Sequence, residues 1–208
     1  MEELEKEKIW PGRFDGVNLK ILYFAHRHLL KDHTYWLFLK VYRWLSHHDL
    51  VIGSSEGGEL TSTVMPENYF MDYSDVQAGE GYRNLSQITV VQVTRMVNAG
   101  IYTRFLEEHN KTAVGKILFT DHSFLKYPLL VNDRTEFFRR AEHYRIRLGD
   151  WFISPLHPVT SNLEAWDFNP GCYPVAARIA SQIVNLPTDT KDYRKVLAFL
   201  EKNLELIL

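Results

Sequence analysis

The sequence has a single cysteine, no long uninterrupted apolar run and no excess of positive charge. One cysteine, Cys172, excludes an internal disulfide and a zinc site built from several cysteines, and it favours a reducing compartment. The 24 Lys and Arg stand against 26 Asp and Glu, which gives a formal charge of −2. This balance argues against non-specific binding of nucleic acid, because such binding needs a basic excess to displace phosphate counterions.

Long apolar segments are also missing. A membrane-spanning helix needs roughly 20 consecutive apolar residues, and the most apolar region, residues 17–45, is interrupted by charged side chains throughout. Residues 1–8 are mostly charged and lack the apolar core of a signal peptide. We therefore expect a cytoplasmic protein without a membrane span. Residues 17–45 are typical of one or two helices that pack within a larger assembly, or alternatively of helices that lie on a membrane surface.

Several catalytic signatures are absent as well. The sequence contains neither the Gly-x-Ser-x-Gly motif of a serine hydrolase nor the His-Glu-x-x-His motif of a zinc enzyme. Its nine histidines include His26 and His33, which could share one helical face, but no matching carboxylate spacing accompanies them. We expect no metal site. We also expect Cys172 to be buried as a small apolar residue rather than to act as a nucleophile.

What is present is a chain long enough for a substantial core, with 208 residues of which 45% are hydrophobic and 24% charged. The order of helix and strand signals along the chain predicts an α+β protein in three parts. These are a helical connector over residues 1–78, a long interdomain helix over 79–110 and a small α+β domain over 111–208.

The long helix is predicted from apolar residues at steps of three and four. Its start signals are Asn84 with Gln87 three residues later, or Ser86 just inside. Gly100 in its middle suggests that another backbone passes close by, since glycine weakens a helix by about 1 kcal/mol relative to alanine. The predicted apolar face comprises Val90, Val93, Val97, Ile101 and Phe105.

Strand signals follow in the last part of the chain. Residues 124–131 and 146–154 predict two strands, the first of them at a sheet edge or bulge because it contains Pro128. The loop over residues 155–172 has three prolines and little periodicity, so it is suited to carry a site.

Helix signals alternate with these strands. Asp133 with Glu136 three residues later predicts a helix start, and Pro174 opens another helix. Residues 187–190 are expected to end a short strand and cap a strongly periodic last helix. We therefore expect helices packed on a short sheet.

Two segments could carry chemistry. Residues 79–87 combine two glycines with Arg83 and short polar side chains just ahead of the long helix, where free N–H groups and the positive dipole end favour an anion such as phosphate. Alternatively, Asn84 and Ser86 only cap that helix. In residues 149–158 a strand runs into His157 between prolines, where the ring could donate to a substrate or cofactor oxygen. Alternatively, loop packing alone fixes this histidine.

The order of several motifs resembles the C-terminal half of DegT/DnrJ/StrS-type aminotransferases, which use pyridoxal phosphate (PLP) and often act on nucleotide sugars. The first motif is similar to the family's Asn-Tyr-Arg-Met-Ser segment, which opens a long helix, and the last two are similar to its Pro-x-Ala and Asn-Leu-Pro-Thr-His endings. The resemblance covers residues 79–208, with 9–73 as the connector. The matching stretches are residues 82–93 (YRNLSQITVVQV), 127–131 (YPLLV), 148–158 (LGDWFISPLHP), 171–176 (GCYPVA) and 183–188 (IVNLPT).

The resemblance implies the small C-terminal domain of a fold type I PLP enzyme, whose large PLP domain is missing here. It also implies a homodimer with active sites between subunits, and a small-molecule substrate. By the same resemblance, the residues before the long helix would contact the cofactor phosphate of a neighbouring subunit. His157, from its position in the loop, is expected to bind the substrate. The implied cofactor-binding residues are Tyr82, Arg83, Asn84 and Ser86.

The chain departs from the family pattern in three places. The family's Asn-Tyr-Arg order appears as Tyr82-Arg83-Asn84, and Asp189 stands where a histidine is usual. No lysine has the Ser-x-x-x-Lys type of context expected for the Schiff base, the nearest candidate being Lys20.

The resulting expectation is the C-terminal part of a PLP-dependent aminotransferase that transfers an amino group to a keto-sugar or similar carbonyl compound. It would contain no catalytic residue of its own and would be inactive alone, pairing as a homodimer or with a partner chain that carries the large PLP domain. The alternative is a non-catalytic α+β module that binds a partner or ligand.

Overall fold

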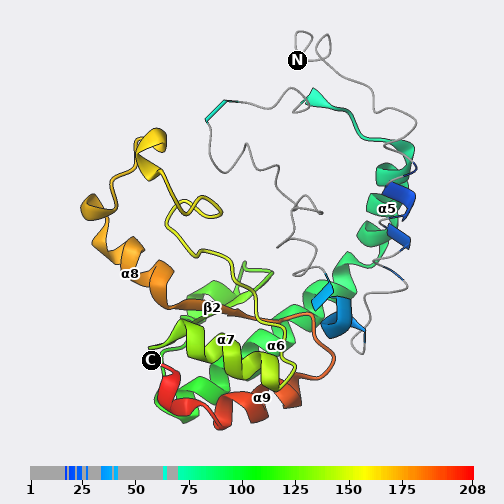
Figure 1. Ribbon diagram of the computed structural model, residues 1–208. Helices are drawn as coiled ribbons and strands as arrows, with labels where there is room; N and C mark the ends of the chain where they lie inside the picture. Colours follow the sequence, from blue (N-terminus) through cyan, green and yellow to red (C-terminus); the bar gives the residue numbers. More distant parts are fainter. Residues whose placement is uncertain are drawn as a thin grey trace. The chain divides into compact units, whose positions relative to one another are not determined.

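The structure is a computed structural model, and its chain divides into two compact units, Met1–Ser86 and Gln87–Leu208, called here the N-terminal and the C-terminal unit. Each unit is described by itself (Figure 1). The predicted boundaries after residues 78 and 110 remain predictions. The structure describes residues 17, 19–21, 23–24, 27, 34–38, 40–41, 63–64 and 70–208.

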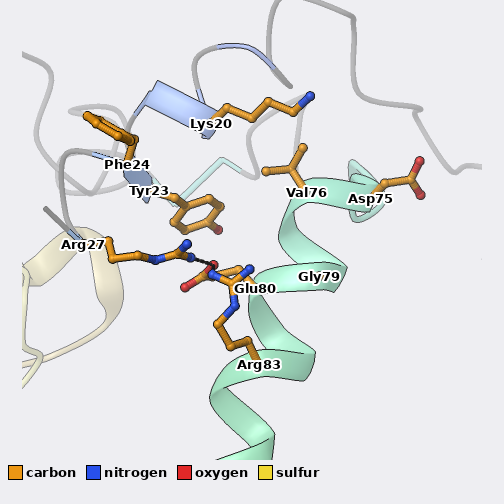
Figure 2. Close-up of a pocket in the computed structure, with 9 residues that line it drawn as sticks. All are labelled: Lys20, Tyr23, Phe24, Arg27, Asp75, Val76, Gly79, Glu80 and Arg83. Atoms are coloured by element: carbon orange, nitrogen blue, oxygen red, sulfur yellow. Dashed lines mark hydrogen bonds and ion pairs between the residues drawn. The ribbon is translucent and has the colours of Figure 1, made fainter.

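Helix α5, Asp75–Ser86, ends the N-terminal unit. It begins with a reciprocal cap, because Ser74 Oγ accepts from the Gln77 backbone N–H at 3.3 Å and Gln77 Oε1 accepts from the Ser74 N–H at 2.9 Å. Glu80 and Arg83 form an ion pair one turn apart on its surface (Figure 2). The capping signal used by the chain is therefore Ser74 with Gln77, which the sequence analysis did not identify.

Helix α6, Ile88–Glu108, opens the C-terminal unit. The predicted start at Asn84 or Ser86 is wrong, because both residues belong to α5, and Gln87 separates the two helices without a side-chain cap. The close backbone expected at Gly100 is also not seen, since the nearest atom to a Cβ built there is a ring carbon of Phe119 at 4.0 Å.

The face of α6 that packs into the core differs from the predicted one. Phe105 is buried as predicted, whereas Val90, Val93 and Val97 are 71%, 56% and 54% exposed. The core covers only the C-terminal half of the helix. The apolar residues of the N-terminal half keep the helical spacing but are not packed against the core. The buried residues are Asn98, Ala99, Tyr102, Thr103, Phe105 and Leu106.

Strands β1, Tyr127–Leu130, and β2, Ile183–Leu186, form a two-stranded antiparallel sheet in which Tyr127 pairs with Leu186 and Leu130 with Ile183. β1 lies within the predicted strand 124–131. The strand predicted over 146–154 is wrong, because only Gly149 makes a bridge, opposite Asn185. Phe152 has a φ of 67°, which is incompatible with extended pairing there.

Three α-helices and several short 3₁₀ turns complete the C-terminal unit. α7 is Arg134–His143, α8 is Pro174–Gln182 and α9 is Tyr193–Glu201. The predicted cap at Asp133 is confirmed, since its side chain accepts from the Glu136 N–H. The cap of α9 is Asp192, two residues beyond the segment predicted to cap it. The 3₁₀ turns are η2 (Lys116–Phe119), η3 (Leu163–Trp166), η4 (Pro170–Cys172) and η5 (Leu204–Leu206).

The core of the C-terminal unit lies where α6, α7 and α9 meet the sheet. Phe137 of α7 and Phe199 of α9 pack edge to face with ring centroids 5.0 Å apart, and the two helices lie side by side in Figure 1. This arrangement of helices on a small antiparallel sheet agrees with the predicted α+β class. The largest fully buried side chains are Tyr102, Tyr127, Phe124, Phe137, Phe199, Leu106, Leu129, Leu186, Leu200, Ile207, Val131 and Val184.

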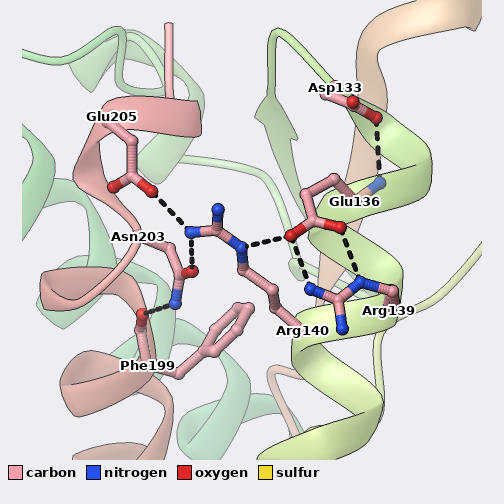
Figure 3. Close-up of polar contacts among 7 residues, drawn as sticks. All are labelled: Asp133, Glu136, Arg139, Arg140, Phe199, Asn203 and Glu205. Atoms are coloured by element: carbon pink, nitrogen blue, oxygen red, sulfur yellow. Dashed lines mark hydrogen bonds and ion pairs between the residues drawn. The ribbon is translucent and has the colours of Figure 1, made fainter.

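A charged network joins α7 to the C-terminal turn η5 (Figure 3). Glu136 accepts from Arg139 Nε at 2.6 Å and from Arg140 Nε at 2.7 Å. Arg140 also donates to Asn203 Oδ1 at 2.9 Å and to the Glu205 carboxylate. The hydrogen bonds from Arg139, and then those from Arg140, lower the pKa of Glu136 from 4.5 to about 2.

This network predicts an acid-dependent contribution to stability. A carboxylate whose pKa is lower in the folded than in the unfolded state stabilises the fold above its unfolded pKa, and this contribution disappears as the pH falls through the folded value. Glu136→Gln should therefore lower the urea midpoint at neutral pH, and the difference from wild type should shrink between pH 4.5 and about 2. Glu164→Gln, which removes an exposed charge from η3, is the control. A difference that persists unchanged at about pH 2 would contradict the assignment.

Candidate functional site

The residues predicted to contact the cofactor, Tyr82, Arg83, Asn84 and Ser86, lie in the C-terminal half of α5 and are all exposed. The anion site expected at the N-terminus of the long helix is thus not formed as predicted. These residues sit near the end of α5, where the dipole of the helix is negative and favours cations. Arg83, in the last turn, suits that position.

The contacts of these residues also show that they do not form a single binding site. Arg83 is paired with Glu80 at 2.9 Å, and the Ser86 hydroxyl donates to the Arg83 carbonyl at 2.7 Å. Tyr82 and Ser86 are four residues apart and share a face of the helix, whereas Asn84 is two residues from each and lies on another face. The chain therefore offers separate polar groups along an exposed helix.

Arg83 does, however, line a pocket of about 530 Å³ within the N-terminal unit (Figure 2). Arg27 enters it from a helical segment more than fifty residues earlier and contacts the same oxygen, Glu80 Oε2, at 2.5 Å. The sequence analysis did not associate Arg27 with the site, because nothing local links residues that far apart. The lining residues are Lys20, Tyr23, Phe24, Arg27, Asp75, Val76, Gly79, Glu80 and Arg83.

His157 lies in a tight turn of the C-terminal unit, in the loop predicted to carry a site. Its backbone N–H donates to the Ser154 carbonyl at 3.1 Å, and the Ser154 hydroxyl donates to the Val159 carbonyl. Its ring packs against Phe152 with centroids 5.9 Å apart. Nδ1 is buried and has no hydrogen-bond partner among the described residues, so a ligand could reach this nitrogen only if the loop moved.

The surroundings of His157 are unusually apolar for a protein surface. Trp151, Phe152 and Ile153 are exposed directly before the turn, and Lys126 lies over the Trp151 ring at 5.9 Å. Asn185 Nδ2 fixes the start of this loop by donating to the Trp151 carbonyl at 3.2 Å. A planar or sugar-like ligand could stack here beside an imidazole.

Cys172, by contrast, is not buried as predicted but exposed at the end of η4. In the parts of the chain that the structure describes, no group of three or more His, Cys, Asp or Glu side chains could hold a metal ion. The histidines weighed for such a site, His26 and His33, lie outside the described residues. The described helices include none that is both long and apolar enough to cross a membrane.

Comparison with known protein families identifies the class to which this fold and these motifs belong. The model of the DegT/DnrJ/EryC1/StrS aminotransferase family matches residues 42–196, well over half of the 208-residue chain. The chain belongs to this family, as its motifs predicted. Neither the curated proteins nor the solved structures contain a match to the chain.

Members of this family generally depend on PLP, so the residues can be tested for their fit to that cofactor. The guanidinium of Arg83 is a donor that suits a phosphate, whereas the Ser86 hydroxyl already donates to the Arg83 carbonyl and Asn84 lies on another face. Among the described residues, no atom lies within 4 Å of a Cβ built on Gly79 or Gly81, so these residues form no backbone cradle there. Lys20 lines the pocket, but its side chain points away from Glu80 in Figure 2. The described residues thus offer one cationic group for the cofactor phosphate, Arg83, and do not enclose the rest of the cofactor.

Proposed function

We propose that this chain is the small-domain part of a PLP-dependent aminotransferase of fold type I, which transfers an amino group to a keto-sugar or a similar carbonyl compound. The large domain and the lysine that anchors the cofactor would come from a partner chain, and the chain alone would be inactive. Its place of action would be the cytoplasm, as its single cysteine suggests.

The observation that carries this proposal is the apolar face of α6 that the described residues of the C-terminal unit leave exposed. Residues 88–94 contain no charged side chain, and Val90 and Val93, three residues apart, are exposed on one face of the helix. Met96 and Val97 extend the same surface by one turn. A monomeric protein seldom leaves such a continuous apolar surface in water, which supports a further domain as its cover.

The chemistry divides between cofactor and protein. When bound, PLP supplies the carbonyl group that carries the amino group and the ring that delocalises charge. In this chain, Arg83 would bind the phosphate, and Tyr82, Asn84 and Ser86 are the other residues that the family resemblance assigns to it. His157 would orient a polar group of the substrate once a movement of its loop exposes the ring, while Trp151 and Phe152 exclude water from that side.

The exposed face of α6 gives a direct test. The isolated chain should bind a dye that fluoresces on apolar surfaces, and Val93→Asp should lower that fluorescence severalfold, because a charge breaks the continuous surface. Val175→Asp is the matched control, since Val175 is an exposed valine on α8, outside this face. Equal effects of the two substitutions would count against a docking role for α6.

The cofactor provides the result that would contradict the proposal most directly. We expect that PLP added to the chain and reduced with borohydride leaves no stoichiometric adduct at one lysine, as peptide mass spectrometry would measure. Such an adduct would mean that the chain holds its own anchoring lysine. A dye-negative monomer without an adduct would instead support the alternative, a non-catalytic α+β module that binds a ligand or partner.

A further inference from the structure

Strand β2 contains a buried amide between apolar neighbours. Residues 183–186 are all buried, and Asn185 is 2% exposed between Val184 and Leu186. Asparagine is disfavoured in strands, and a buried amide is costly unless it makes hydrogen bonds. The partners of Asn185 should therefore explain why a polar residue occupies this position.

The described hydrogen bonds of Asn185 lead to the start of the His157 loop. Its backbone N–H donates to the Gly149 carbonyl at 3.1 Å, and its carbonyl accepts from the Gly149 N–H at 2.8 Å. Its side-chain Nδ2 donates to the Trp151 carbonyl at 3.2 Å. Across the sheet its partner is Pro128, which has no backbone N–H. Backbone and side chain of one residue thus tie residues 149–151, called here the loop start, to β2.

Two cations contact the same loop start. Arg134, at the beginning of α7, donates from Nε to the Ile183 carbonyl at 2.9 Å and from Nη2 to the Asp150 carbonyl at 3.3 Å. Lys126 lies 5.9 Å from the centroid of the Trp151 ring. Two successive carbonyls, those of Asp150 and Trp151, are therefore held by side chains from outside the loop.

The following residues 152–159, called here the loop tip, are held differently. The His157 N–H donates to the Ser154 carbonyl at 3.1 Å, and the Ser154 hydroxyl donates to the Val159 carbonyl. These hydrogen bonds stay within the tip. Phe152, at the junction with the loop start, has a φ of 67°, which is unfavourable for a bulky residue. A rotation of the tip about this junction would keep its internal hydrogen bonds, whereas a movement of the loop start would break those to β2.

We propose that Asn185 is a positioning residue, which fixes the loop start so that Trp151 keeps its place beside β2 while the loop tip moves and exposes His157 to a ligand. The proposal rests on the proposed function in that Trp151 and His157 are taken there as residues that face the substrate. It accounts for the buried amide in an apolar strand. It also accounts for the buried Nδ1 of His157, which has no hydrogen-bond partner among the described residues until the tip moves.

The test follows the indole N–H signal of Trp151 by NMR in the full 208-residue chain labelled with ¹⁵N. The chain has five tryptophans, so Trp151→Phe assigns the signal, and Trp166 of η3 is the internal reference. Asn185→Ala should shift the Trp151 signal and leave that of Trp166 in place. Asn132→Ala, at an exposed asparagine of the same unit, is the matched control and should shift neither.

Amide hydrogen exchange separates the loop start from the loop tip. In the wild type, exchange at His157 should be faster than at Gly149, because the tip opens while the start stays on β2. Asn185→Ala should speed exchange at Gly149 about tenfold, the effect of weakening one hydrogen-bonded contact. Exchange at His157 should change much less, since its hydrogen bond lies within the tip.

Two further variants distinguish positioning from packing. Asn185→Asp keeps the shape but places a carboxylate against the carbonyls of Gly149 and Trp151, so it should shift the indole signal at neutral pH. At about pH 4 a protonated carboxyl can donate to the Trp151 carbonyl, and the signal should return toward its wild-type position. Asn185→Ala should show no such return. If Asn185→Ala does not fold, Gly149→Ala replaces it, because its Cβ would stand 3.1 Å from that of Asn185.

The results also separate this proposal from the proposed function. An unmoved Trp151 signal in both Asn185 variants, or equal acceleration of exchange at Gly149 and His157, would overturn the positioning role. Without a lysine adduct of PLP, that result would leave the proposed function standing. A loop start released by the Asn185 variants, in a chain that does form a stoichiometric adduct, would keep the positioning role and reject the proposed function.

Discussion

Replacing Phe199 with alanine is expected to lower the free energy of unfolding of the C-terminal unit by about 3–5 kcal/mol, the usual cost of deleting a buried phenyl ring. Phe199 is fully buried in α9. Its ring meets Phe137 of α7 edge to face at 5.0 Å and Tyr144 at 5.7 Å. Alanine would leave a cavity between α7 and α9 that the surrounding side chains fill only in part.

The measurement is amide hydrogen exchange across residues 193–201, combined with urea denaturation followed by circular dichroism. Hydrogen exchange over these residues reports the stability of the C-terminal unit separately from that of the N-terminal unit. This distinction is needed because a chain of two compact units need not unfold in one step. Phe152→Ala is the control, since that ring is half exposed, and it should change stability by less than about 1 kcal/mol. A similar loss in both variants would mean that Phe199 is not part of a tightly packed core.

Replacing Asn98 with alanine should have the second largest effect. Asn98 is 3% exposed, and its Nδ2 donates to the carbonyls of Thr188 and Thr190 at 2.7 and 2.9 Å. Alanine would leave both carbonyls without this donor, and an unsatisfied buried group costs about 1–3 kcal/mol. We expect a loss of about 2–3 kcal/mol and faster amide exchange over residues 188–190.

A second variant separates the effect of the Asn98 hydrogen bonds on stability from the effect of its side-chain volume. Asn98→Asp keeps the size but places an acceptor opposite two acceptors, so it should destabilise the unit more than Asn98→Ala at neutral pH. Asn132→Ala, at an exposed position of the same unit, should be nearly neutral. If Asn98→Asp were the milder variant, the two carbonyls would not be held by the amide, and the link from α6 to residues 187–190 would need another explanation.

Local signals in the sequence were sufficient where a few neighbouring residues decide the structure. The helix start at Asp133 followed from a side chain that caps its own N–H groups, and the structure has that hydrogen bond. Pro174 at the start of α8 is a similar case. Ser74 and Gln77, which cap α5, have the same three-residue spacing as Asn84 and Gln87, which do not start a helix.

Local sequence signals were misleading where a residue far away in the sequence determines the structure. Residues 146–154 have strand-like composition, yet they form a loop because only Gly149 comes close enough to Asn185 to pair. A Cβ built on Gly149 would stand 3.1 Å from the Asn185 side chain, so a larger residue here would require Asn185 to shift by a few tenths of an ångström. Of the candidate site, the sequence indicated Arg83 and His157 but not Arg27, which meets Glu80 only through the tertiary fold.

By itself, the sequence determined the family, the α+β class and those helix starts where a capping residue satisfies the N–H groups next to it. Tertiary structure decided which half of α6 is buried, which segment pairs with β1 and which cation joins Arg83 at Glu80. The physical reason is that periodicity and capping act over one or two helical turns, whereas burial and ion pairing depend on segments that only folding brings together.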